Sequence, residues 1–296
     1  METGIELLHV LQDFRLSMPS TVDGFFLLLS SPFVYMILPI CIGSLLLWFV
    51  GKENGEKVLL SITASMAVSA IVKFAVKQPR PWVMDPTIQP PDEALRTAGG
   101  YSLPSGHTSC SVAGFGSVFL SYGNKALRIA CVSLMVLIPF SRLYLCVHTP
   151  LDIISGAAVA IAVIIINCKA VPWSHRSYRN RSIFLMGYIA AFVISAIWSL
   201  LAGANPKGLD YMGMAMGLLF GLMIEERFVH YEIRSRDTKR NIGMAALGLL
   251  MIAAAFSVPY LTMGRGVGSY LGGALCLLSA TVLCPYIFKK MDEKGA

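Results

Sequence analysis

Three short segments of this chain carry charged and nucleophilic side chains at spacings that could support catalysis. The last of them holds Arg142, His148 and Asp152 between two apolar runs, where an unpaired charge is costly and therefore usually functional. Thr149 is a good helix N-cap and Pro150 suits the first helical position, so we expect a helix to begin just after the histidine. One turn then brings the aspartate back to the imidazole, fixing its tautomer and leaving the other ring nitrogen free to attack an electrophile. Ordinary helix capping would explain the same residues.

The first segment places two cations at the end of an apolar run. Lys73 and Arg80 are seven residues apart, about two helical turns, so both side chains can point from one face if the helix continues. Pro79 and Pro81 flank the arginine and indicate a stiff, extended exit from the helix. Taken alone, the pair could equally be interfacial residues whose charged ends reach water.

The second segment, Pro104-Ser105-Gly106-His107, predicts the start of a helix that could bind an anion. Serine is a good N-cap, glycine leaves backbone N–H groups uncovered, and a helix N-terminus attracts negative charge. His107 would lie in the first turn, where it could protonate an oxygen leaving that anion. A capped helix with an interfacial histidine is the alternative for this segment.

Together, the three segments favour phosphoryl transfer. Three fixed cations and a helix N-terminus suit a group whose negative charge spreads over its equatorial oxygens. Two histidines on opposite sides of that group, one a nucleophile and one an acid, predict in-line displacement through a phosphohistidine. We find no carboxylate cluster suited to magnesium and no spacing suited to zinc, so we expect no metal and no cofactor. The cations would act in place of a metal.

The composition indicates a membrane protein. Of the 296 residues, 55% are hydrophobic and only 14% are charged, and the mean hydropathy is +0.66. Several runs approach or exceed the roughly 18 to 20 apolar residues that span a bilayer as a helix. We therefore expect an all-α, polytopic transmembrane helix bundle with the lipid bilayer as its partner. The basic residues lie in short loops and form no continuous basic face, which argues against nucleic acid as a partner.

Nine membrane spans are predicted after an interfacial N-terminal segment, residues 1–22. Residues 23–203 would form a core of six spans that carries all three segments, and residues 204–296 would add three more. Residues 52–57 are expected to form a turn and residues 78–104 a polar loop. The predicted spans are residues 25–50, 58–77, 105–122, 126–145, 150–168, 182–203, 209–229, 241–262 and 267–288.

The distribution of basic residues predicts an orientation. If the odd-numbered spans end in the cytoplasm, sixteen of the 24 Lys and Arg residues lie in cytoplasmic loops. The positive-inside rule then places the N-terminus outside and the C-terminus inside. All three segments would meet at the extracytoplasmic face of the cell (plasma) membrane. A transporter or flippase would also place charges at mid-span, so the gathering of charge at one face disfavours that alternative.

A stripe of glycines in the seventh span predicts a close helix contact. Gly213, Gly217 and Gly221 recur every fourth residue, which lets a neighbouring backbone approach closely. The neighbour could belong to the same chain or to a second copy. The second outcome would make the protein a homo-oligomer through this stripe.

Several residues outside the three segments have simpler interpretations. Glu225 and Glu226 end a predicted span beside Arg227 and are expected to form interfacial pairs with it. His175 and His230 lie in basic loops and are expected to be solvated. The seven cysteines are scattered singly through apolar runs, which predicts small buried residues rather than disulfides.

The order and spacing of the three segments resemble a family signature. Lys73-x6-Arg80-Pro81, Pro104-Ser105-Gly106-His107 and Ser141-Arg142-x5-His148-x3-Asp152 are similar to the complete three-part signature of the type-2 phosphatidic acid phosphatase superfamily. That superfamily includes membrane lipid phosphatases and soluble vanadium haloperoxidases. The resemblance covers about residues 58–168, and the many apolar runs of spanning length exclude the soluble branch.

The resemblance implies metal-independent dephosphorylation. His148 would be the nucleophile, Asp152 would orient it, and His107 would be the acid for the leaving group. The residues that would bind the phosphoryl oxygens are Lys73, Arg80, Ser105, Gly106 and Arg142.

The expected substrate is a phosphate or pyrophosphate ester of a membrane lipid. Undecaprenyl pyrophosphate, phosphatidylglycerophosphate and phosphatidic acid are the candidates, and a lipid phosphotransferase with the same site is the alternative. Core members of the family typically have about the first six spans alone, so the last three are an addition. We expect that addition to affect substrate choice and assembly rather than the chemistry.

Overall fold

The computed structural model shows a chain folded into helices joined by loops. The residues it describes are 2–203, 210–234, 237–264 and 266–295. The described ranges contain no strand, which confirms the all-α class. Residues 204–209, including the predicted domain boundary, lie outside the described residues. The same holds for Lys207, Arg236 and Arg265, which enter the count of basic residues.

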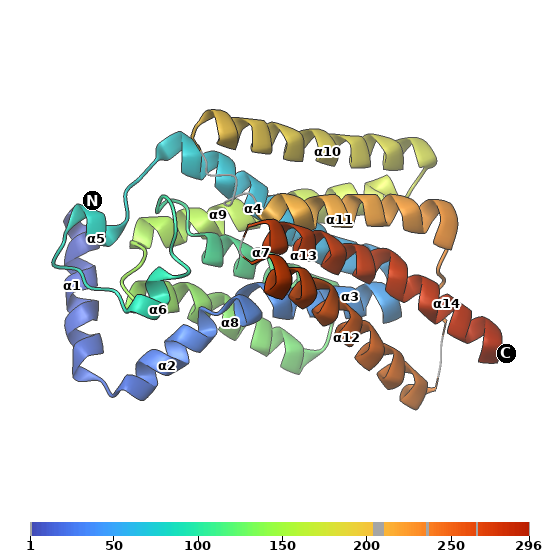
Figure 1. The fold of residues 1–296 in the computed structure, drawn as a ribbon, viewed down its shortest axis with the longest axis horizontal. Coiled ribbons are helices and arrows are strands. Elements are labelled where there is room, and N and C mark those ends of the chain that lie inside the picture. The colour runs from blue at the N-terminus through green and yellow to red at the C-terminus, as the bar shows by residue number, and fades with distance from the viewer. Residues whose placement is uncertain (1, 204–209, 235–236, 265, 296) are drawn as a thin grey trace.

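The helices of the first part of the chain carry the three segments of interest and the loops between them. They are α1 (Glu2–Ser17), α2 (Ser20–Leu29), the π-helix η1 (Phe33–Ile37), α3 (Leu38–Phe49), α4 (Lys52–Val76), the single turns α5 (Pro81–Met84) and α6 (Asp92–Leu95), α7 (Gly106–Ser121), α8 (Lys125–Tyr144) and α9 (Pro150–Ser174). The later helices are α10 (Tyr178–Leu201), α11 (Asp210–Ile224), η3 (Glu225–Val229), α12 (Thr238–Met263), α13 (Val267–Leu278), η4 (Ser279–Leu283) and α14 (Cys284–Gly295). Figure 1 shows α1, α5 and α6 at one end of the bundle and the C-terminal end of α14 at the other.

Seven segments of the described residues are long and apolar enough to cross a membrane. They are Ser20–Phe49, Lys52–Met84, Lys125–Tyr144, Pro150–Ser174, Tyr178–Leu201, Thr238–Met263 and Val267–Glu293. The other two predicted spans correspond to α7 and α11, which have only 16 and 15 residues. The prediction of nine spans is therefore too high by this measure. Most of α7 is buried, and it packs against α4, α8 and α9, so neighbouring helices rather than lipid cover it.

Two predicted boundaries were wrong because the helices continue beyond the apolar runs from which they were predicted. Residues 52–57 form the first turns of α4 rather than a turn, and Glu53 and Lys57 pair across one turn at 4.0 Å. Similarly, α9 continues past residue 168 to Ser174. The predicted extended exit from the helix is confirmed, since α4 ends at Val76 and the chain is extended at Arg80.

Glycines set the closest helix contacts. A Cβ at Gly156 on α9 would lie 2.7 Å from the carbonyl oxygen of Ser105, so the glycine brings α9 directly against the start of α7. The glycine stripe of α11 faces α13 and η4 of the same chain. A Cβ at any of its three positions would collide with an atom of that neighbour, namely Tyr270 O, Ala274 O and Thr281 Oγ1 for Gly213, Gly217 and Gly221. The stripe is thus filled within the chain, and a homo-oligomer, which stays a prediction, needs another surface.

Candidate active site

The start of α9 follows the predicted capping pattern. The Thr149 side chain accepts a hydrogen bond from Asp152 N at 3.4 Å, and the Asp152 carboxylate accepts one from Thr149 N at 2.8 Å. This reciprocal cap places Asp152 Oδ2 at 3.2 Å from His148 Nδ1, and both side chains are buried. A carboxylate there favours the tautomer with the proton on Nδ1, which leaves the Nε2 lone pair available.

Two residues that the sequence analysis did not single out also hold Asp152. Ser102 Oγ donates to Asp152 Oδ2 at 2.6 Å, and Gln78 Nε2 donates to Asp152 Oδ1 at 3.2 Å. Gln78 lies between the two cations of the first segment, and Ser102 lies just before the second segment. Both are ordinary polar loop residues, so nothing in the sequence marks them.

The three predicted cations all reach the end of the polar loop, residues 97–104. Because all three side chains bond to this loop, the end of α4, the extended segment that follows it and the end of α8 lie close together. The contacts are Lys73 Nζ to Tyr101 O at 2.8 Å and to Pro104 O at 3.0 Å, Arg80 Nη2 to Gly99 O at 2.7 Å, Arg80 Nε to Gly100 O at 3.0 Å, and Arg142 Nη1 to Thr97 Oγ1 at 3.4 Å.

Arg80 faces the expected nucleophile. Its Nη1 lies 2.9 Å from His148 Nε2 and also donates to the carbonyl oxygen of Val147 at 3.1 Å. The Trp82 ring lies 5.7 Å from the centre of the guanidinium, a cation–π contact that covers one side of it. Arg80 is therefore held by surrounding groups in a direction that points toward the reactive nitrogen.

Arg142 differs from the other two cations because two of its three donor nitrogens are not used. The side chain is completely buried, yet its Nε and Nη2 have no hydrogen-bond partner among the described residues. A buried guanidinium with unfilled donors is costly, so such groups normally have a partner. An anion that entered the site would supply one.

The start of α7 leaves space beside its backbone. Ser105 caps the helix by accepting a hydrogen bond from Thr108 N at 3.4 Å, and Ser105 N donates to Asp152 O at 2.9 Å. A Cβ at Gly106 would meet no atom within 4 Å. The exposed backbone at this helix N-terminus can thus approach an anion closely.

His107 is buried in the first turn of α7, as predicted. Its Nε2 lies 3.1 Å from the carbonyl oxygen of Ser30, and the Tyr35 ring lies against it with the ring centroids 4.0 Å apart. Ser30 Oγ in turn lies 2.7 Å from Ser141 Oγ, next to Arg142 in the chain. The second histidine therefore belongs to the same end of the bundle as the cations.

The electrostatics of the site act on His148. Burial lowers the pKa of its imidazole well below the usual 6.5, and the charges of Arg80, Arg142 and Lys73 lower it further. His148 is thus neutral at neutral pH. A neutral imidazole keeps the lone pair that nucleophilic attack requires.

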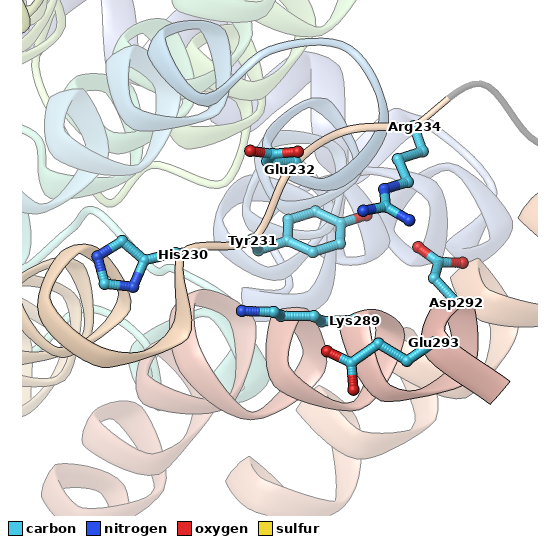
Figure 2. Close-up of a pocket in the computed structure, with 7 residues that line it drawn as sticks. All are labelled: His230, Tyr231, Glu232, Arg234, Lys289, Asp292 and Glu293. Carbon is cyan, nitrogen blue, oxygen red and sulfur yellow. The ribbon is translucent and has the colours of Figure 1, made fainter. Parts of the chain in front are cut away.

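A separate cavity lies at the other end of the bundle (Figure 2). It has a volume of about 230 Å³, and Figure 2 shows side chains of both charges around it. Its lining consists of His230, Tyr231, Glu232, Arg234, Lys289, Asp292 and Glu293. None of the predicted catalytic or phosphate-binding residues is among them.

Comparison with known families gives two matches that together cover most of the chain. The PAP2 superfamily matches residues 56–176, and the family described as PAP2 superfamily phosphatase, transmembrane extension, matches residues 209–295. The chain belongs to the PAP2 superfamily. It is a multi-pass membrane phosphatase of this superfamily that carries the transmembrane extension. No curated protein and no solved structure gives a match.

A second cluster of charges joins the PAP2 match to helices that follow it. Arg181 on α10 donates to both carboxylate oxygens of Glu56 on α4, at 2.8 and 3.0 Å, and lies 2.5 Å from Glu226 Oε1. Lys52 Nζ donates to Glu225 Oε1 at 2.7 Å. The extension of the PAP2 protein is thus linked to its core by ion pairs that are partly buried.

These pairs correct two sequence-based expectations. Glu225 and Glu226 do not pair with Arg227 but with basic residues far away in the chain, because neighbours one or two positions apart on a helix do not face each other. His175 is not simply solvated, since its Nε2 lies 3.1 Å from Glu56 Oε2. In this PAP2 protein it belongs to the second cluster.

Proposed function

We propose that this PAP2 phosphatase hydrolyses a phosphate or pyrophosphate monoester of a membrane lipid through a phosphohistidine on His148. The observation that supports this most directly is the buried Arg142 guanidinium with two unused donor nitrogens. A phosphoryl group offers several negatively charged oxygens and would fill those donors, with a neutral nucleophile close to the same loop.

The first half-reaction transfers the phosphoryl group to the enzyme. His148 Nε2 attacks the terminal phosphorus, an N–P bond forms, and the bond from that phosphorus to the leaving oxygen breaks, which belongs to the lipid alcohol in a phosphate ester and to the lipid phosphate in a pyrophosphate. The electron pair goes to the leaving oxygen, which takes a proton from His107. Arg80 Nη1, now 2.9 Å from the attacking nitrogen, exchanges that contact for a phosphoryl oxygen.

The second half-reaction restores the enzyme. A water molecule attacks the phosphohistidine while His107 accepts a proton from it. The N–P bond breaks, inorganic phosphate leaves, and His148 regains its lone pair. The imidazolium that forms on His148 during transfer is stabilised by Asp152, which lies 3.2 Å from its Nδ1.

The cations stabilise the charge that develops on the phosphoryl oxygens. Lys73, Arg80 and Arg142 supply the cationic groups, and the α7 N-terminus near Ser105 and Gly106 adds the positive end of its helix dipole. Preorganised cations of this kind perform the task that magnesium performs in other phosphoryl-transfer sites. The proposed reaction is therefore metal-independent.

The predicted orientation supports a substrate on the outer side of the membrane. The site residues gather at the end of the bundle that carries α1, which the basic residues place outside the cell (plasma) membrane. A lipid tail would enter laterally between helices while its head group reaches the cations. Undecaprenyl pyrophosphate, phosphatidylglycerophosphate and phosphatidic acid are the candidate substrates.

Phosphate release from these three lipids tests the proposal. The purified full-length protein is incubated with each lipid, with and without a chelator, and inorganic phosphate is measured. We expect release from at least one lipid and no effect of the chelator. Loss of release on chelation would contradict the metal-independent reaction.

Two further readouts separate the alternatives. Labelled phosphate appearing on an added lipid or sugar acceptor would identify a phosphotransferase. Movement of lipid between leaflets of reconstituted vesicles without phosphate release would identify a transporter or flippase.

A further inference from the structure

The bend between α2 and η1, residues 30–35, lies outside the family match but contacts the histidine proposed as the acid. The match begins at residue 56. Nevertheless, the Ser30 carbonyl oxygen and the Tyr35 ring are the contacts of the His107 imidazole described above, and both Ser30 and His107 are buried. A segment that precedes the matched domain therefore contributes to its site.

The break in the helix at this bend explains why the Ser30 carbonyl is available. Val34 N and Tyr35 N both bond to Ser31 O, at 3.0 and 3.1 Å. In an uninterrupted α-helix, Val34 N would bond to Ser30 O instead. The bend thus leaves one carbonyl for a side-chain donor from another helix.

This contact decides which nitrogen of His107 can work in catalysis. A carbonyl oxygen only accepts hydrogen bonds, so Nε2 must carry a proton to bond to Ser30 O. The proton that moves in the reaction is then the one on Nδ1. When the His107 imidazole is charged, its Nδ1–H can donate a proton to the leaving oxygen. When the imidazole is neutral, its Nδ1 can accept a proton from water.

The Tyr35 ring limits how the imidazole can turn. It lies against the His107 ring at an angle of 39°, and the backbone around it is tied to α7 because Cys110 Sγ donates to Tyr35 O at 3.6 Å. Rotation of the imidazole would require the tyrosine ring to move. The ring contact and the carbonyl contact therefore restrain the same side chain from two directions.

We propose that Tyr35 and the Ser30 carbonyl are positioning groups for His107, which hold its Nδ1 toward the leaving oxygen of the substrate. This inference rests on the proposed function, in which His107 protonates the leaving group. It assigns a catalytic contribution to the region before the PAP2 match, separate from the charged residues of the signature.

The test compares two substrates in the Tyr35→Leu variant. An alkyl lipid phosphate needs a proton on its departing oxygen, whereas p-nitrophenyl phosphate releases a weakly basic phenolate that needs little assistance. We expect kcat to fall by about tenfold or more for the lipid phosphate and by less than about twofold for p-nitrophenyl phosphate, with KM nearly unchanged. Turnover of the second substrate also reports that the variant is folded.

Two variants serve as controls. Tyr35→Phe keeps the ring and should retain the wild-type ratio of the two activities. Phe33→Leu removes an aromatic ring from the same π-helix, where the side chain is 63% exposed, and should change neither activity. Equal loss on both substrates in Tyr35→Leu, or no loss on either, would overturn the inference.

His107→Asn distinguishes a failure of this inference from a failure of the proposed function. If His107 is the acid, this variant must also lose far more activity on the lipid phosphate than on p-nitrophenyl phosphate. If it shows no such difference, the assignment of His107 is wrong. If it shows the difference and Tyr35→Leu does not, only the positioning role is wrong.

Discussion

Two clusters of buried charge lie at opposite ends of α9, and they are built differently. His148 lies two residues before the first residue of this helix and His175 directly follows it, so the 25 residues of α9 separate the clusters by about 37 Å at a rise of about 1.5 Å per residue. Around His148, the described residues place three cations near one carboxylate, that of Asp152. Around His175, Arg181 and Lys52 are matched by glutamates.

The difference in charge balance shows which cluster is available for a ligand. In the cluster around Arg181, both oxygens of Glu56 are bonded and Glu226 also pairs with the arginine, so that Nε is its one donor nitrogen without a partner among the described residues. These charges link the extension to the core. In the cluster around Arg142, two donor nitrogens are unused. Buried charge that has no partner is costly, and its presence indicates a functional site rather than a structural one.

Replacing the two histidines should give the largest contrast. His148→Ala removes the proposed nucleophile and should lower phosphate release by at least about a thousandfold. His175→Ala is the matched control at the other end of α9 and should keep turnover within about threefold. Phosphate release from a lipid phosphate, normalised to folded protein, measures both. Substantial turnover by His148→Ala would rule out the phosphohistidine.

Breaking the ion pairs around Arg181 should affect the stability of the protein rather than its catalytic activity. Arg181→Met leaves the buried Glu56 without its bidentate partner and should lower the free energy of unfolding by about 3–5 kcal/mol. Turnover per folded molecule should be unchanged. Denaturant unfolding in detergent measures the first quantity. Adding Glu56→Gln to the variant should recover part of the loss, and a failure to do so would argue against the ion pair as the cause.

The same substitution at Arg142 should lower catalytic activity and leave stability unchanged or higher, the opposite of the result expected at Arg181. Arg142→Met removes donors proposed to act on the phosphoryl oxygens and should lower kcat/KM by about a hundredfold. Because it also removes a buried charge without a full set of partners, the free energy of unfolding should stay the same or rise. A variant that lost stability as severely as Arg181→Met would show that the two clusters are alike.

The two histidines should also contribute to stability in opposite directions of pH. Burial and three nearby cations lower the pKa of His148, so its unfolded form takes up a proton at higher pH than its folded form. Its contribution to stability is present above the unfolded value of 6.5 and is lost as the pH falls below it. A hydrogen bond to Glu56 raises the pKa of His175, so its contribution is full below 6.5 and is lost as the pH rises through the folded value.

Unfolding measurements between about pH 5 and 8 would check these signs. As the pH falls, the wild type should lose stability relative to His148→Ala. As the pH rises, the wild type should lose stability relative to His175→Ala. Curves with the same slope for both variants would contradict the contrast between the clusters.

Local sequence signals predicted the local structure of the three segments well. The cap at Thr149, the cap at Ser105 and the extended exit at Arg80 all depend on residues within one or two turns of each other, and the structure has them where expected. The catalytic roles of these residues stay predictions. The errors concern the surroundings of the helices: α7 and α11 are too short to count as candidate spans and pack against neighbouring helices, which hydropathy alone does not reveal.

The sequence by itself determined the residue types, the helix starts and the reactive spacings, since these depend on interactions between neighbours in the chain. Only the tertiary structure decided which distant groups complete the site. Ser30 is 77 residues from His107, and Ser102 is 50 residues from Asp152. Such pairs are chosen by how the helices pack, because a serine or a carbonyl carries no local signal of the partner it will meet. The same reason explains why Glu56 was paired with Arg181 only once the fold was known.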